Sequence, residues 1–104
     1  MISNHIIPLL PAVRECLHQL PVKQAWLYGS FSRGEETPAS DVDIMVRYDE
    51  QVPVTLLTIG HISNELESVL GRRVDLVEHD RLRPRARESA YKDRILIYER
   101  NDQG

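Results

Sequence analysis

The sequence predicts an α+β fold: a small mixed β-sheet with helices on one face. Three segments carry helical patterns, four shorter runs have the apolar or alternating character of strands, and no repeat or linker divides them. Because these segments alternate within 104 residues, we expect residues 1–104 to form a single domain around one modest core. Helices on one face would leave the other face of the sheet to hold a site.

The helical segments are bounded by residues that commonly start or stop helices. The first covers residues 8–18, where two prolines suit the first turn, and Pro21 ends it. The second and longest opens near Pro53 and closes at Gly71, because glycine is common just after the last helical residue. The third is a short, Arg-rich stretch at residues 82–91.

Four short runs are predicted as strands. They cover residues 24–28, 41–48, 73–78 and 95–98. The second run alternates, which places Val42, Ile44 and Val46 on one face and Asp41, Asp43 and Met45 on the other. Residues 29–40, which contain Ser, Gly, Thr and Pro, are expected to form a loop with one helical turn. A polar, frayed tail is expected after the last strand.

Composition and charge exclude several classes of protein. With 41% hydrophobic and 28% charged residues, the chain has the balance of a soluble globular protein. No apolar run approaches the roughly 18 residues that a membrane span needs. The single cysteine, Cys16, cannot form an intramolecular disulfide, so we expect a cytoplasmic protein. The net charge of -3 argues against direct nucleic-acid binding, which depends on clustered Lys and Arg.

Charge is nevertheless unevenly distributed along the chain. Acidic residues crowd residues 35–50, whereas six Lys and Arg residues crowd residues 81–94. An acidic site beside a basic stretch suits a metal with a triphosphate, or an acidic protein partner. The basic run is also typical of a solvated helix face.

Asp41 and Asp43 form the first candidate site. Residues i and i+2 of a strand share a face, with Cα atoms about 6.6 Å apart, so both carboxylates can converge on a divalent metal. Carboxylate oxygens suit Mg²⁺, which is usually held by one or two carboxylates together with substrate phosphates. Taken alone, an Asp-x-Asp pattern is more often a solvated strand face or a turn.

Asp75 lies between two apolar residues of the third predicted strand, so its side chain is expected to face away from the core. If that strand neighbours residues 41–48, Asp75 joins the two earlier aspartates. It could then complete a second metal site and accept the proton of an attacking hydroxyl. Three such carboxylates would repel one another without metal, which raises their pKa values. The alternative is a solvent-facing carboxylate near a sheet edge.

Gly29 and Ser30 end the first strand, ten residues before the Asp-x-Asp pair. A glycine lets the backbone approach a ligand, and a following helical turn directs free amide groups and the Ser30 hydroxyl toward anionic oxygen. Arg33 could neutralise charge on a polyphosphate, or it could be a surface residue paired with Glu35 or Glu36. A P-loop is excluded, because these two glutamates stand where that motif needs Lys and Ser or Thr.

The segment GSFSRGEETPASDVDIMV resembles the Gly-Ser, ten residues, Asp-x-Asp signature of the DNA polymerase β-like nucleotidyltransferase superfamily, specifically its minimal branch, the minimal nucleotidyltransferases (MNT). The downstream segments RRVDLVEHDRLRPRARE and KDRILIYE are also similar to that branch, so the resemblance spans nearly the whole chain. It implies a fold like the polymerase β palm. It also implies that Gly29 and Ser30 bind triphosphate, that Asp41 and Asp43 bind Mg²⁺, and that Asp75 completes the triad.

The resemblance implies a biological role as well. Minimal members commonly occur beside a HEPN-domain partner in prokaryotic toxin–antitoxin pairs, as the antitoxin that transfers AMP from ATP to a tyrosine of the HEPN ribonuclease. The expected function is therefore a Mg²⁺-dependent protein adenylyltransferase that works in a homo- or hetero-oligomer. Two alternatives stay open: a non-catalytic antitoxin that acts by occlusion, and a nucleotidyltransferase that modifies an antibiotic. The sequence shows no additional domain like those with which larger relatives bind nucleic acid or an antibiotic.

Overall fold

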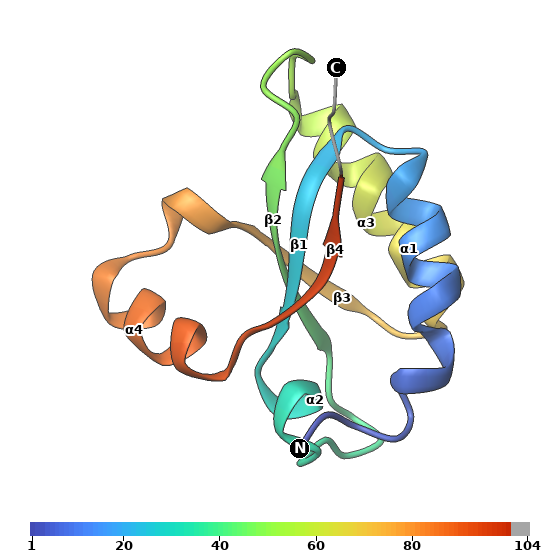
Figure 1. Cartoon of the computed structure of the whole chain (residues 1–104), viewed down its shortest axis with the longest axis vertical. Coiled ribbons are helices and arrows are strands. Elements are labelled where there is room, and N and C mark those ends of the chain that lie inside the picture. Colours follow the sequence, from blue (N-terminus) through green and yellow to red (C-terminus); the bar gives the residue numbers. More distant parts are fainter. Residues whose placement is uncertain (101–104) are drawn as a thin grey trace.

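The helices and strands follow the order that the sequence predicts, with two short 3-10 turns added. The computed structural model describes residues 1–100. The predicted tail, from residue 101 onward, lies outside the described residues. The elements are η1 Ile7–Leu9, α1 Leu10–His18, β1 Val22–Tyr28, α2 Ser30–Arg33, β2 Val42–Tyr48, α3 Leu56–Leu70, β3 Val74–Glu78, η2 His79–Arg81, α4 Pro84–Asp93 and β4 Ile95–Glu99 (Figure 1).

The four strands form one mixed sheet in the order β3-β2-β1-β4. β1 runs antiparallel to both β2 and β4, whereas β2 and β3 are parallel. The parallel pair requires a crossover, and α3 provides it. The α+β class and the mixed sheet predicted from the sequence are confirmed.

The main core lies between one face of this sheet and the helices α1 and α3, which Figure 1 shows side by side on the right of the strands. The alternating residues of β2 point into it, as period-2 patterning predicts. Its fully buried side chains include Val13, Leu17, Ala25, Leu27, Val42, Ile44, Val46, Ile62 and Leu66. α3 begins at the N-cap Thr55 and ends at Gly71, whose φ of 67° is the left-handed conformation expected of a C-terminal glycine.

The opposite face of the sheet is not left free of helices, because α4 packs on part of it (Figure 1). Trp26 and Met45 are buried there against Ala90, with Leu82 and Tyr91 packed around them. The sequence did not predict that α4 packs on the sheet. The segment has few apolar residues among many charged ones, which is the pattern of a solvent-exposed helix. The face predicted to hold a site is therefore shared between α4 and the acidic ends of β2 and β3.

Within residues 1–100, every helix is too short or too polar to cross a membrane.

Candidate functional site

Asp43 of β2 and Asp75 of β3 are paired residues of neighbouring parallel strands. The residues on either side of each aspartate pack in the main core, so both carboxylates lie on the face opposite α1 and α3. Asp41 immediately precedes β2 at the same end of the sheet and is exposed. The structure thus meets the condition that the sequence set for Asp75, which was that its strand neighbours residues 41–48.

The charges of these aspartates act on one another. The pKa of Asp43 is raised to about 6, first by burial, then by the negative charges of Asp75 and Asp41, while the Arg33 guanidinium lowers it. Mutual repulsion was expected from the sequence. The larger effect of burial on the pKa of Asp43 was not expected, because it depends on how deeply the strand is buried by its neighbours.

Tyr28 is a member of this site that the sequence reasoning missed. It is the cross-strand partner of Asp43, so the phenol and the two paired aspartates come from three consecutive strands. Burial raises the pKa of Tyr28 to about 12, and the charges of Asp43 and Asp75 add to the effect. The position of Tyr28 directly before Gly29 was the one sequence feature that could have placed it at the site. On its own, however, the sequence indicates only an ordinary aromatic residue of a strand.

Gly29 is required by the shape of the site. Its φ of 73° and ψ of -154° belong to a region open essentially to glycine. A Cβ atom at this position would collide with the carboxylate oxygen Oδ2 of Asp43 and lie 3.1 Å from its Cγ. The corner after β1 therefore fits directly against the carboxylate that the sequence singles out.

The short helix α2 is held rigidly behind this corner. The Ser32 hydroxyl donates to the carbonyl oxygen of Gly29 over 2.7 Å, and the Glu35 amide donates to the carbonyl of Ser30 over 2.9 Å. From the N-terminal segment, the Ser3 amide donates to the carbonyl of Phe31 over 2.8 Å. Among residues 1–100, no group makes a hydrogen bond with the Ser30 hydroxyl, so it remains available to a ligand.

Arg33 is already paired. Its Nε lies 2.6 Å from Oε1 of Glu35, and one Nη lies 2.8 Å from Oδ2 of Asp93 at the end of α4. The sequence left open whether Arg33 meets a polyphosphate or a neighbouring glutamate, and the pairing with Glu35 is present. The second partner, Asp93, is 60 residues away and could not be foreseen.

The carboxylate oxygens at the end of the sheet that carries Asp43 and Asp75 are suitable ligands for Mg²⁺, since this ion prefers carboxylate oxygens in proteins. The missing Cβ of Gly29 lets the Asp43 carboxylate lie directly against the backbone of the corner. In the part of the chain that the structure describes, however, no three His, Cys, Asp or Glu side chains are gathered closely enough to enclose a metal ion. The fit is to an ion held by one or two carboxylates and completed by a ligand.

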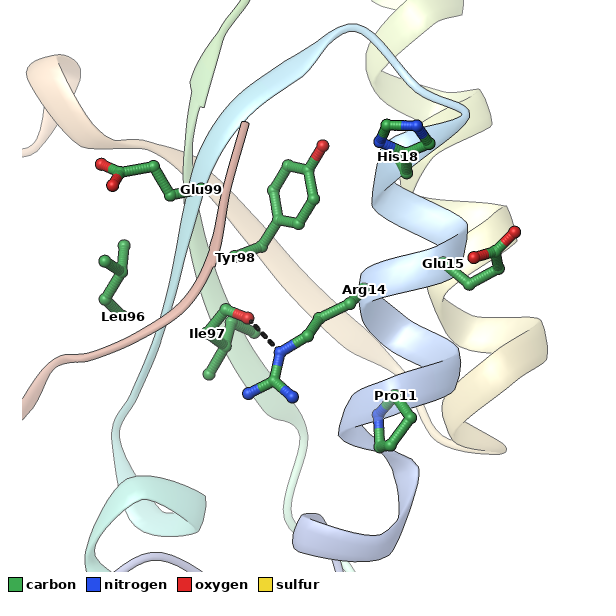
Figure 2. Close-up of a pocket in the computed structure, with 8 residues that line it drawn as sticks. All are labelled: Pro11, Arg14, Glu15, His18, Leu96, Ile97, Tyr98 and Glu99. Atoms are coloured by element: carbon green, nitrogen blue, oxygen red, sulfur yellow. Dashed lines mark hydrogen bonds between the residues drawn. The ribbon is translucent and has the colours of Figure 1, made fainter. Parts of the chain in front are cut away.

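Two cavities lie away from the aspartates. One, of about 620 Å³, lies between α1 and the edge strand β4, where Arg14 Nε donates to the carbonyl of Ile97 over 2.9 Å (Figure 2). The other, of about 820 Å³, lies beyond the far ends of β2 and β3. Neither of these two cavities is lined by Asp41, Asp43 or Asp75.

Comparison with known proteins agrees with this geometry. The profile of the nucleotidyltransferase domain family matches residues 10–97, and the chain belongs to that family. A Methanocaldococcus jannaschii protein assigned as a protein adenylyltransferase is 39% identical over 75 residues, which cover 72% of this chain and 73% of the relative. The protein adenylyltransferase MntA of Thermococcus cleftensis is 32% identical over 84 residues, covering 81% and 83%.

Solved structures show the same fold. A structure described as a minimal nucleotidyltransferase superposes with a TM-score of 0.69 at 32% identity, covering 91% of this chain and 95% of that one. A Shewanella oneidensis MNT antitoxin, in complex with a tri-AMPylated HEPN toxin, superposes with a TM-score of 0.65 at 17% identity, covering 89% and 71%. The expectations of a minimal nucleotidyltransferase and of a palm-like fold are confirmed.

Proposed function

We propose that this chain is a cytoplasmic antitoxin that transfers AMP from ATP to a tyrosine hydroxyl of a partner HEPN toxin. The observation that carries the proposal is the pairing of Asp43 with Asp75 beside the glycine corner at Gly29. Two further facts support it: curated relatives of similar length are named protein adenylyltransferases, and a structural neighbour is an MNT antitoxin bound to an AMPylated HEPN toxin.

In the proposed reaction, the acceptor hydroxyl oxygen forms a bond to the α-phosphorus of ATP. The bond from that phosphorus to the bridging oxygen breaks, and pyrophosphate leaves. Asp75 orients the hydroxyl and takes its proton. Asp41 and Asp43 would hold Mg²⁺, which when bound supplies charge neutralisation at the phosphate oxygens.

The triphosphate would lie against the corner that follows β1. There the backbone of Gly29 permits close approach, and the Ser30 hydroxyl is available as a donor. Arg33 would exchange one of its carboxylate partners, Glu35 or Asp93, for phosphate oxygen. This exchange keeps its charge paired both with and without nucleotide.

The test uses ATP labelled at the α-phosphate and a HEPN protein that co-purifies with this chain from its native host. Wild-type protein should label the HEPN protein, and label at the γ-phosphate should not transfer, which separates adenylylation from phosphorylation. The Asp43→Ala variant should lose the transfer and keep the circular-dichroism spectrum of the wild type. Full labelling by Asp43→Ala would show that the assigned mechanism is wrong.

Glu50→Ala provides the matched control, because Glu50 is an exposed carboxylate in the loop after β2 and should not affect transfer. The alternative function, neutralisation by occlusion, predicts a different result. In that case an Asp41→Ala, Asp43→Ala double variant would still block the toxin without labelling it.

A further inference from the structure

The segment that carries α4 is a basic arm on an acidic chain. We define the basic arm as residues 81–94. It contains six of the 13 Lys and Arg residues of the protein, but only two of the 16 Asp and Glu residues. Since the whole chain has a net charge of -3, the rest of it is strongly acidic. Figure 1 shows α4 apart from α1 and α3, on the other side of the strands.

Three cations of the basic arm are exposed and unpaired. The side chains of Arg83, Arg85 and Lys92 make no hydrogen bond or ion pair with any residue from 1 to 100. By contrast, Arg81 is paired with Glu78 at 3.0 Å, and Arg87 donates to the carbonyl of Leu82 over 3.1 Å. The exposed face of α4 therefore presents positive charge that nothing in the described chain neutralises.

The placement of Arg83 and Arg85 opposes the stability of the helix itself, whereas Lys92 lies in the last turn, where the helix dipole favours positive charge. Arg83 is the N-cap of α4 and Arg85 lies in its first turn, where the helix dipole disfavours positive charge. No acidic residue lies in that turn, and no side chain caps it. A charge pattern that works against its own helix is typical of a surface selected for an interaction.

The basic arm is nevertheless held firmly on the sheet. The His79 ring lies 4.6 Å from the Trp26 ring and 4.7 Å from the Tyr91 ring, centroid to centroid. The Tyr91 hydroxyl donates to the carbonyl of His79 over 3.1 Å, and Arg94 donates to Nε2 of the same histidine over 2.5 Å. The exposed cations are thus presented by an anchored helix.

The far end of α4 reaches the candidate site. Asp93 is bonded to Arg33, which follows the Gly29 corner by one helical turn. Arg33 also acts electrostatically on Asp43. The C-terminal end of α4, where Lys92 also lies, is therefore next to the site, and a macromolecule that covers the helix from Arg85 to Lys92 would extend to that end.

We propose that Arg83, Arg85 and Lys92 form the docking surface for an acidic patch on the acceptor protein. This inference rests on the proposed function, because it names the surface through which that acceptor is recognised. Opposite charges on the two partners speed encounter and fix orientation. Docking on α4 would bring the acceptor hydroxyl to the end of the sheet where Asp75 lies.

An acidic protein fits this surface better than RNA does. Single-stranded nucleic acid is held by exposed aromatic rings that stack on bases, together with a continuous positive groove. The aromatic ring of α4, Tyr91, is stacked inward on His79. The neighbouring end of the sheet carries Asp41, Asp43 and Asp75, which would repel a polyanion that extends past the helix.

The experiment measures binding of the same HEPN protein of the native host, by titration calorimetry without ATP, at several salt concentrations. Arg85→Glu should weaken binding by about 10-fold or more at low salt, and the loss should shrink as salt screens the charges. The melting temperature of this variant should equal or exceed that of the wild type, because the reversal removes an unfavourable charge from the first turn. Lys23→Glu is the matched control: it makes the same charge change at an exposed residue near the start of β1, and it should change affinity less than 2-fold.

Each outcome has a defined meaning. Wild-type affinity in Arg85→Glu, or an absence of binding by the wild-type chain, overturns the docking surface. It is also overturned if single-stranded RNA binds the wild type and loses affinity in Arg85→Glu while HEPN binding is unchanged. If docking depends on Arg85 but the wild type transfers no AMP, the proposed function fails and the docking surface stands.

Discussion

Gly29 occupies a backbone conformation that other residues avoid, directly against the Asp43 carboxylate. Gly29→Ala should therefore destabilise the protein by about 2 kcal/mol or more, because it combines backbone strain with a collision. Since Asp43 must move to relieve the collision, nucleotide transfer should fall more than stability alone explains. Urea unfolding and a transfer assay on the folded variant measure the two effects.

Gly60 is the matched control for this substitution. It lies inside α3, and a Cβ atom there would meet nothing within 4 Å. Gly60→Ala should stabilise the protein by about 0.5–1 kcal/mol, because alanine is the better helix former. Equal effects at the two glycines would show that Gly29 has no special place beside Asp43.

The raised pKa of Asp43 makes stability depend on pH. Its value of about 6 lies above the ordinary 3.8, so the folded state holds this proton more tightly than the unfolded state does. The resulting stabilisation is complete below pH 3.8 and is lost as pH rises through 6. At pH 7 and without metal, Asp43→Asn should therefore be more stable than wild type, by on the order of 1 kcal/mol after allowing for solvent screening.

Urea unfolding at pH 7 and at pH 4 measures this difference. The advantage of Asp43→Asn should disappear at pH 4, where the wild-type carboxyl is protonated in the folded state. A constant difference at both pH values would mean that the amide changes packing and that ionisation of the buried Asp43 carboxyl is not the cause.

At the scale of helices and strands, the sequence predicts the elements well because each carries its own periodicity. β2 shows this most clearly, since its alternation assigned Val42 to the core face and Asp43 to the site face, as the structure has them. β1 begins at Val22, two residues before the predicted start, because Pro21 obscures the beginning of the strand. Which strands neighbour one another cannot be read from periodicity, so the pairing of Asp43 with Asp75 needed the structure.

α4 shows where periodicity gives too little information. The sequence places a helix at residues 82–91, and the structure has it at Pro84–Asp93. The packing of α4 on Trp26 and Met45 depends on a single buried alanine and on the ring of Tyr91. These are too few apolar positions to give a recognisable helical periodicity. The same is true of the bond between Arg33 and Asp93, which joins residues that are far apart in the chain.

For the whole molecule, the uneven charge of the sequence becomes a spatial arrangement. Acidic residues gather at one end of the sheet, and the basic arm lies on the same face of the sheet beside them. Two groups of like charge are unfavourable in the isolated chain. Both would be relieved by the proposed ligands: Mg²⁺ and a triphosphate at the aspartates, and an acidic partner at α4.

This arrangement predicts how the melting temperature responds to ligands. Mg²⁺ with α,β-methylene ATP, whose α–β bridge cannot be cleaved, should raise Tm by about 10 °C or more at 100 times its Kd, because binding to the folded state alone adds about 2.7 kcal/mol. The same nucleotide with EDTA should have little effect. Compared with wild type, Asp43→Asn should have a higher Tm without ligand at pH 7. Its Tm should rise much less than that of wild type when Mg²⁺ and nucleotide are added. Loss of fold cannot produce those two opposite shifts, so a normal ligand response in Asp43→Asn would remove Asp43 from the metal site.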